Sequence, residues 1–158
     1  MSSQDRDSGF TMIELLVTIS LLGIMMAIAV SGYTSWAKAS NQSGRARELQ
    51  SVMRQAQVRA VTEGRAICVS FRVAQNDYTV YRGACGSPTE TVLGPVASQS
   101  ADVRLSAPVF TGTSGVSTGV TFNARGTAWP GSVQLTRAGS SKTFTLTVEG
   151  MTGRVSLS

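Results

Sequence analysis

The sequence predicts an α+β fold in which one long N-terminal helix packs on an antiparallel β-sheet or a small β-sandwich. The first observation is an almost wholly apolar run that ends at Val30. The second is helical spacing of apolar residues as far as Gly64, and the third is alternating spacing from Ala66 onward. Short strands punctuated by glycines favour antiparallel pairing. A chain of 158 residues, 15% of them charged and 42% hydrophobic, has room for one compact domain after the helix.

The apolar run from Phe10 to Val30 contains a single charged residue, Glu14. About 20 helical residues, at a rise of ~1.5 Å each, cover the ~30 Å hydrocarbon core of a bilayer. The run is longer than the apolar region of a secretory signal peptide, and no small-residue cleavage site follows it. We therefore predict a retained transmembrane helix over residues 10–32.

The charge of Glu14 requires an explanation. A carboxylate at the bilayer midplane costs roughly 2.5 to 3.5 kcal/mol and normally marks a function. One alternative is that an acid in the first turn complements the helix dipole at headgroup depth. If the chain is cut between Gly9 and Phe10, however, a new α-amino group lies one helical turn before Glu14. Opposite charges then lie at one end of an apolar helix.

Residues 9–17 read Gly-Phe-Thr-Met-Ile-Glu-Leu-Leu-Val, and an apolar helix follows them. This segment resembles the class III signal of type IV pilins and type II secretion pseudopilins. The resemblance implies that a prepilin peptidase cuts after Gly9, that the new N-terminal amine of Phe10 is methylated, and that Glu14 pairs with this amine on an adjacent subunit during filament assembly. An unrelated single-pass membrane anchor is the alternative.

Two features depart from the family pattern. Ser31 stands where the family often has a proline that helps to bend the helix or melt it locally. Gly23 and Gly32 could supply part of this flexibility, because glycine has a low helix propensity. The leader contains one basic residue against two acidic ones, so the positive-inside signal is weak and topology depends on the cleavage motif. The segment Asn41-Gln42-Ser43-Gly44 is a candidate bend between the lipid and soluble halves of the helix.

The second half of the helix is amphipathic and ends at Gly64, which is placed for a left-handed cap. We interpret its apolar stripe as a face that packs on the chain's own sheet, and a partner-binding groove as the alternative. The stripe consists of Leu49, Val52, Met53, Ala56 and Ala60.

The remaining chain alternates in the manner of short strands. Gln75-Asn76-Asp77 is a predicted hairpin turn. Residues 83–100 are predicted to be loop-like, with a short strand around Val92. Trp129-Pro130-Gly131 has the pattern of an exposed turn, and its Trp is either a contact point or a partly buried anchor. The predicted strands cover residues 66–73, 78–82, 103–105, 116–122, 133–136, 143–149 and 154–157.

Cys68 and Cys85 are the only cysteines. In an exported domain they meet an oxidising compartment, and a bridge between them closes a loop of about 15 residues, worth ~3 kcal/mol in the chain-entropy model. We favour a disulfide over two reduced thiols. A metal site is not expected, because two cysteines without any histidine give too few soft ligands.

The whole chain resembles, more closely, the H-type pseudopilins (GspH) and FimT-type minor pilins. The features that carry this resemblance are the helix end at residues 63–65, the strand that follows it, the element at residues 122–126 and the closing strand. The implied organisation is a leader at 1–9, a transmembrane helix at 10–32, an amphipathic helix at 33–64 and a soluble antiparallel β domain at 65–158.

The resemblance implies a structural minor subunit of a type IV pilus or a type II secretion pseudopilus, and the two remain open. The implied partners are a prepilin peptidase, other pilin-like subunits, an inner-membrane platform protein and an assembly ATPase. The implied location is the inner (cytoplasmic) membrane, with a single pass and the soluble domain outside the cytoplasm, and then an extracytoplasmic or cell-surface filament.

No enzyme activity and no cofactor are expected. The chain has no histidine, no paired acids at a motif spacing and no phosphate-binding glycine loop. The acids of the soluble part look like scattered solvated charges.

The alternative function is DNA binding during natural transformation. The formal charge is +5, and some FimT-like minor pilins bind DNA through a C-terminal Gly-Arg-x-Arg segment. Here Gly153-Arg154-Val155-Ser156 lacks the second Arg. The candidate phosphate contacts are Arg125, Arg137, Lys142 and Arg154, against the simpler interpretation of a solvated basic surface.

Overall fold

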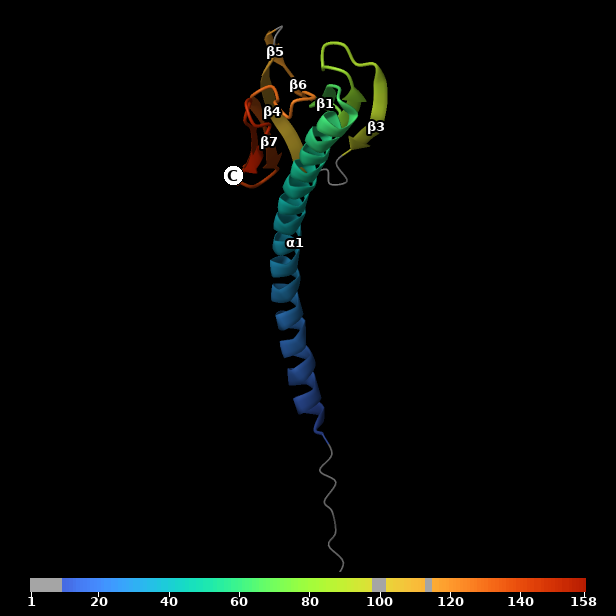
Figure 1. Cartoon of the computed structure of the whole chain (residues 1–158). Coiled ribbons are helices and arrows are strands. Elements are labelled where there is room, and N and C mark those ends of the chain that lie inside the picture. The colour runs from blue at the N-terminus through green and yellow to red at the C-terminus, as the bar shows by residue number, and fades with distance from the viewer. Residues whose placement is uncertain (1–9, 98–101, 113–114) are drawn as a thin grey trace, which may run out of the picture. The chain divides into compact units, whose positions relative to one another are not determined.

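The computed structural model describes residues 10–97, 102–112 and 115–158 (Figure 1). The chain divides into two compact units, one ending at Lys38 and the other covering Ala39–Ser158. Helix α1 (Met12–Glu63) runs from the first unit into the second. The leader, residues 1–9, lies outside the described residues.

In the first unit α1 is helical without interruption, through Gly23, Ser31 and Gly32. None of its apolar residues is buried, and an 18-residue window has a mean hydropathy of 2.4. By length and composition this stretch can cross a membrane.

The second unit contains two antiparallel sheets. The first has the order β3-β2-β1-β6 and the second the order β5-β4-β7-β8-β9. The strands of the first sheet are β1 (Ile67–Arg72), β2 (Asp77–Arg82), β3 (Glu90–Ala97) and β6 (Gly119–Phe122). Those of the second are β4 (Val103–Gly112), β5 (Gly115–Ser117), β7 (Gly131–Arg137), β8 (Phe144–Val148) and β9 (Val155–Leu157). The α+β fold and the antiparallel pairing are confirmed.

One hydrophobic core joins the helix to both sheets. Four of the five predicted stripe residues of α1 are buried and the fifth, Val52, is partly buried against them. The two sheets meet at Phe71 of β1 and Phe110 of β4, whose ring centroids are 5.9 Å apart. The stripe therefore packs on the chain's own sheets, as predicted.

Gly64 ends α1 as predicted. Its φ is 64°, and the Arg65 N–H donates to the Ala60 carbonyl over 3.2 Å. Glycine adopts this left-handed conformation without a steric penalty, so the chain can turn directly into β1.

A hairpin turn forms close to the predicted position, at residues 73–76, and Asp77 is already the first residue of β2, paired with Arg72. Asn76 has a φ of 55°. Its side chain also connects the two sheets. The amide Nδ2 donates to the Val103 carbonyl over 2.7 Å, and Oδ1 accepts from the Leu105 N–H over 2.8 Å. The turn residue thus binds the edge of β4 in the way a neighbouring strand would.

Three strand predictions were wrong in extent. β3 covers eight residues where a loop with a short strand was expected, because an edge strand tolerates Gly94 and Pro95 on its unpaired side. β4 covers ten residues instead of three. Its register shifts between Ser106 and Val109, and a bulge of this kind accommodates Pro108 inside the strand.

The strand predicted over residues 116–122 is two strands that belong to different sheets. The chain changes sheet at Gly119, where an added Cβ would come within 2.9 Å of both Cys85 Sγ and the Val69 carbonyl oxygen. No larger residue fits this crossing without displacing its neighbours.

The predicted bend at residues 41–44 is absent, and α1 continues through it. Gln42, only 1% exposed, donates from Nε2 to the carbonyls of Lys142 over 2.8 Å and Leu135 over 3.3 Å. Because these bonds tie Gln42 to the second sheet, tertiary contact overrides the weak local helix preference of this segment.

Gln42 belongs to a row of glutamines whose side-chain amides bind carbonyls of the second sheet or of the loops beside its strands. Gln50 Nε2 donates to the Val155 carbonyl over 3.1 Å, and Gln57 Nε2 donates to the carbonyls of Thr152 and Gly126 over 2.8 and 3.1 Å. β9 is the edge strand of this sheet, and such an edge exposes unpaired backbone groups. Of these groups in β9, the Gln50 amide satisfies the carbonyl of Val155.

We expect Gln42→Ala to lower the free energy of unfolding by about 1 to 3 kcal/mol, because two carbonyls lose their donor in a buried place. The measurement is urea unfolding of the full chain in detergent micelles. Gln55→Ala is the matched control, since Gln55 is exposed on the same helix, and it should change stability by less than about 0.5 kcal/mol. Equal effects of the two substitutions would contradict the role of Gln42.

Candidate functional site: the N-terminal helix

Thr11 caps the start of α1. Its backbone carbonyl accepts from the Leu15 N–H over 3.2 Å, and its Oγ1 accepts from the Glu14 N–H over 3.3 Å. A threonine followed three residues later by a glutamate has the pattern of a capping box. Thr11 was not among the residues predicted from the sequence, although its spacing of three residues from Glu14 is a signal that indicates a cap.

Glu14 lies in the first turn of α1 and is exposed. A carboxylate at this position interacts favourably with the positive end of the helix dipole. Phe10, the predicted first residue after cleavage, is 78% exposed and precedes the helix. Gly9 lies outside the described residues. The helix start therefore places an accessible acid one turn after the predicted new amine.

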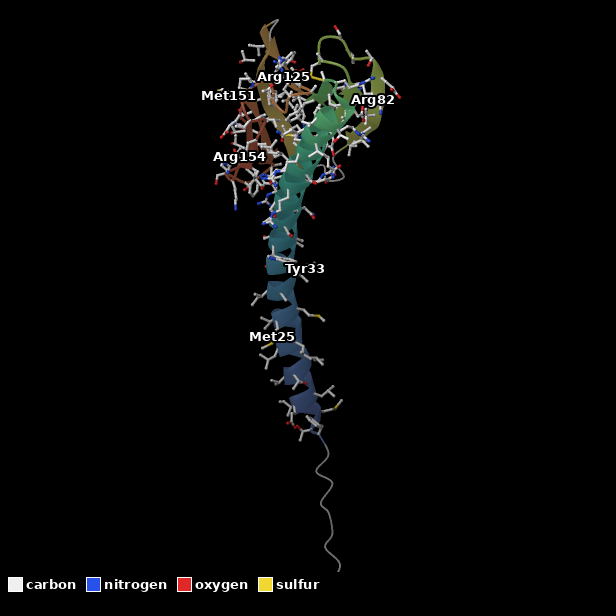
Figure 2. All side chains as sticks on the ribbon, viewed as in Figure 1. Met25, Tyr33, Arg82, Arg125, Met151 and Arg154 are labelled. Carbon is white, nitrogen blue, oxygen red and sulfur yellow. A yellow bond between two sulfur atoms is a disulfide. The ribbon has the colours of Figure 1, made fainter. Side chains whose placement is uncertain are left out.

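Large apolar side chains project from every side of the first unit, as Met25 illustrates in Figure 2. The hydroxyl groups among them are satisfied within the helix. Thr18 donates to the Leu15 carbonyl, Ser20 to the Leu16 carbonyl and Ser31 to the Ile28 carbonyl, over 2.8 to 2.9 Å. Hydroxyls paired in this way do not need water, so the helix surface is suited to an apolar environment.

Cys68 and Cys85 are joined by a disulfide, with their Cα atoms 4.9 Å apart. The bond connects β1 to the loop between β2 and β3. The Cys85 N–H also donates to Thr121 Oγ1 of β6 over 3.0 Å. The disulfide thus ties the loop to β1, and the hydrogen bond ties it to β6.

Trp129 is half-buried and packs against the hydrophobic core. Its ring lies so close to Gly112 that an added Cβ there would come within 2.7 Å of it. Of the two interpretations of the Trp129-Pro130-Gly131 signal, the structure selects the partly buried anchor.

The four candidate DNA contacts are not gathered in one patch. Leu135 of β7 pairs with Phe144 of β8, which places Arg137 and Lys142 together at one end of this sheet. Arg154 lies at the opposite end of the sheet, directly before β9, and its carbonyl accepts from the Glu149 N–H over 3.0 Å. The seven steps along the chain from Lys142 to Glu149 span roughly 23 Å at about 3.3 Å per residue of extended chain.

Arg125 lies at the Arg154 end of the sheet, because Gln57 binds the carbonyls of both Gly126 and Thr152. Figure 2 labels both arginines. At the other end the Lys142 ammonium lies 5.0 Å from the centroid of the Phe144 ring. The basic residues are therefore divided between the two ends of the sheet. Gly153 has a structural role, since an added Cβ would collide with the Gly126 carbonyl and the Gln57 amide.

An ion-pair network holds the end of α1 against the first sheet. Arg82 Nε lies 2.8 Å from Glu63 Oε2, and Arg82 Nη1 lies 2.6 Å from Glu90 Oε2. Arg59 Nε is 3.2 Å from Glu63 Oε1. The hydrogen bond from Arg82 lowers the pKa of Glu63 below its ordinary value of 4.5, and the two carboxylates raise the pKa of Arg82.

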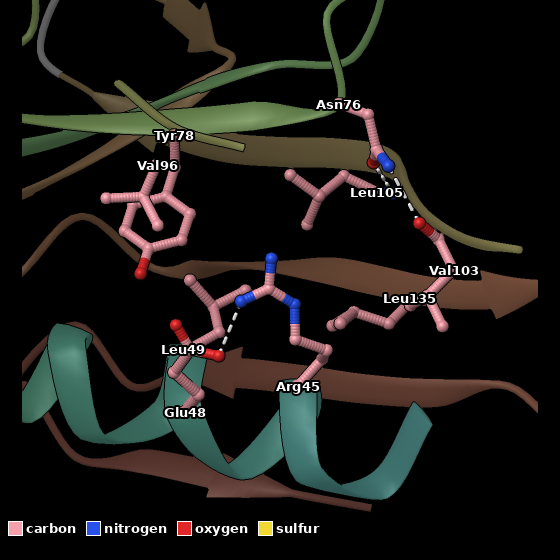
Figure 3. Close-up of a pocket in the computed structure, with 9 residues that line it drawn as sticks. All are labelled: Arg45, Glu48, Leu49, Asn76, Tyr78, Val96, Val103, Leu105 and Leu135. Carbon is pink, nitrogen blue, oxygen red and sulfur yellow. Dashed lines mark hydrogen bonds and ion pairs between the residues drawn. The ribbon is translucent and has the colours of Figure 1, made fainter. Parts of the chain in front are cut away.

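The pocket in Figure 3 has a volume of about 30 Å³ and lies between α1 and strands of both sheets. Arg45 is paired with Glu48 at 2.6 Å on its rim, and burial raises the pKa of the Tyr78 hydroxyl. Ligand sites usually have several hundred Å³, so this space suits one or two waters. Within the described ranges there is also no cluster of three or more potential metal ligands.

Two family profiles match the chain. One, described as Type II transport protein GspH, covers residues 45–152, and the other, the prokaryotic N-terminal methylation motif, covers residues 4–30. The chain belongs to the GspH family. Membership confirms the resemblance to pilin-like proteins, and the methylation motif coincides with the segment that carries Gly9, Phe10 and Glu14. A comparison with curated proteins found no match.

Two solved structures show that this GspH-family chain has the fold of minor pilin-like subunits. The minor pseudopilin EpsH from the type 2 secretion system of Vibrio cholerae is 11% identical, with a TM-score of 0.57 over 75% of this chain and 96% of EpsH. The type IV minor pilin FimU of Pseudomonas aeruginosa is 19% identical, with a TM-score of 0.59 over 78% of this chain and 92% of FimU.

These matches bear on two questions, whether the chain belongs to a class of enzymes and whether it binds DNA. The family and the fold are those of structural filament subunits and not of enzymes. None of the matches supports the DNA-binding alternative, and the separation of the four basic residues gives it no further support.

We expect stability to fall in acid as Glu63 becomes protonated. Because its folded-state pKa is depressed, the stabilisation is present above about pH 4.5 and is lost as the pH falls through the lower folded value. Glu63→Gln should flatten this acid limb when thermal unfolding of the full chain is followed against pH in detergent. The neighbouring Thr62→Ala, which removes no titrating group, should keep the limb, and an unchanged limb in Glu63→Gln would contradict the assignment.

Proposed function

We propose that this chain is a minor subunit of a type IV pilus or type II secretion pseudopilus, stored in the membrane through the first unit of α1 and then incorporated into a filament. The observation that carries the proposal is a single exposed carboxylate, Glu14, in the capped first turn of an otherwise apolar and uncovered helix. The family match and the methylation motif support it.

The exposed apolar surface of the helix needs a covering other than water. Lipid tails supply it before assembly, and the helices of neighbouring subunits supply it in the filament. Gly23, Ala27 and Ala29 are small, and there is open space around Gly23, so another helix can approach closely there.

Glu14 sets the register between neighbours in this proposal. Cleavage after Gly9 creates an amine on Phe10, which becomes methylated and pairs with Glu14 of an adjacent subunit. A carboxylate left unpaired between apolar helices is strongly unfavourable, so the helices are held in the register that joins the two charges. The accessible positions of Phe10 and Glu14 support this role.

The proposed location is the inner membrane, with the β domain outside the cytoplasm. The Cys68–Cys85 disulfide supports this orientation, because such bonds persist in oxidising compartments. A platform protein in the membrane and a cytoplasmic ATPase would then extract the subunit. Subunits of the pilus and of the pseudopilus have the same kind of helix, so the helix does not distinguish them. The genes that neighbour this one would show which of the two filaments the chain belongs to.

We expect Glu14→Val to remain membrane-inserted and to be cleaved, but to be missing from sheared, purified filaments. The reason is that the amine of its neighbour then has no partner in an apolar interface. Immunoblotting of the membrane and filament fractions measures both steps. Glu149→Gln, which removes an exposed acid from the β domain, is the control and should enter filaments normally. Normal incorporation of Glu14→Val would refute the role of Glu14.

Mass spectrometry of the native protein should find a chain that begins at Phe10 and carries one methyl group on its amine. The leader contributes two acids and one base, so its removal changes the formal charge from +5 to +5 − (1 − 2) = +6. In a strain without prepilin peptidase the chain should keep Met1. An intact Met1 start in the native host, without any processed species, would contradict the proposal.

A further inference from the structure

Two aromatic residues follow the apolar stretch on one face of α1. Tyr33 and Trp36 are one helical turn apart, and their ring centroids are separated by 6.1 Å with planes inclined by 40°. Tyr33 is 68% exposed and Trp36 is 66% exposed. Figure 2 shows the position of Tyr33 on the helix. Neither ring is part of the hydrophobic core.

The charge pattern around these rings is that of a membrane boundary. Residues 15–37 contain no charged side chain, and Lys38 is the first charged residue after Glu14. Tyr and Trp are enriched where a membrane meets water, because an apolar ring and a polar N–H or O–H group can each contact the environment that suits it.

The spacing matches the thickness of a bilayer. From Glu14 to Tyr33 is 19 residues and to Trp36 is 22 residues, which correspond to about 28 and 33 Å at ~1.5 Å per residue. The hydrocarbon core is ~30 Å thick. When the two rings lie at one headgroup boundary, Glu14 therefore lies at the other and not at the midplane.

We propose that Tyr33 and Trp36 form an aromatic anchor that binds the headgroup region of a phospholipid bilayer and sets the depth of α1. The anchor keeps the Glu14 carboxylate beside the opposite headgroups, where its charge is tolerated until assembly. This inference rests on the proposed function, since it requires the first unit to be held in a membrane.

Fluorescence quenching tests the depth of Trp36. The chain has two tryptophans, so Trp129→Phe leaves Trp36 as the only one. The full-length variant is reconstituted into phosphatidylcholine and phosphatidylglycerol vesicles whose acyl chains carry bromine either near the headgroup or near the chain end. The anchor predicts stronger quenching by the shallow bromine, so that the ratio of shallow to deep quenching exceeds one.

A probe in the middle of the helix is the matched control. In the triple variant Met26→Trp, Trp36→Phe and Trp129→Phe, the tryptophan is ten residues, or about 15 Å, from position 36. Deep bromine should quench it more strongly than shallow bromine.

Each other outcome overturns the anchor. Stronger quenching of Trp36 by deep bromine places the ring in the hydrocarbon, and no quenching of Trp36 beside a quenched position 26 places it in water. In both cases the helix is in the membrane and the proposed function stands. If alkaline carbonate extracts the protein from its native membrane and neither probe is quenched, the membrane-stored subunit fails together with the anchor.

Discussion

The apolar surface of the first unit of α1 cannot remain in water, and the rest of the structure depends on this constraint. Its hydroxyl groups bond to the helix's own carbonyls, and Thr11 caps the first turn. These hydroxyl groups and the Glu14 N–H are therefore satisfied within the segment, as suits an environment without water. The one carboxylate, Glu14, lies in the first turn of the helix, where the helix dipole reduces the cost of its charge.

In the second unit, α1 packs on the β domain through both apolar and polar side chains. There α1 combines a stripe of apolar residues, in which Ala46, Ala56 and Ala60 let the backbone approach the core, with amides that donate to carbonyls of the second sheet. The Val155 carbonyl of the edge strand accepts from both Gln50 and Arg54. Two strands that meet edge to edge tend to pair, so these donors also protect β9 from unwanted pairing.

Local signals predicted the helix, its packing stripe, the Gly64 cap and the first hairpin, because each depends on periodicity or on one residue's conformation. Features that depend on a partner far away in the sequence were not predicted. The glutamines at 42, 50 and 57 cannot be told from solvated residues in the sequence, because the carbonyls that they bind are about a hundred residues away along the chain. The change of sheet at Gly119 depends on its approach to Cys85, which alternation within residues 116–122 does not reveal.

The transfer of α1 from lipid to a filament depends little on its apolar surface. Lipid tails and neighbouring leucines are about equally apolar, so exchanging one for the other gives almost no hydrophobic gain. The free-energy difference between the two environments must therefore come from close packing at small residues and from the few polar groups. In the proposed assembly, Glu14 at the start of the helix exchanges headgroups and water for the amine of a neighbour. At the far end, the proposed aromatic anchor of Tyr33 and Trp36 leaves the headgroups. A helix with such ends is stable in the membrane, yet it changes environment only where a neighbour offers a matching charge.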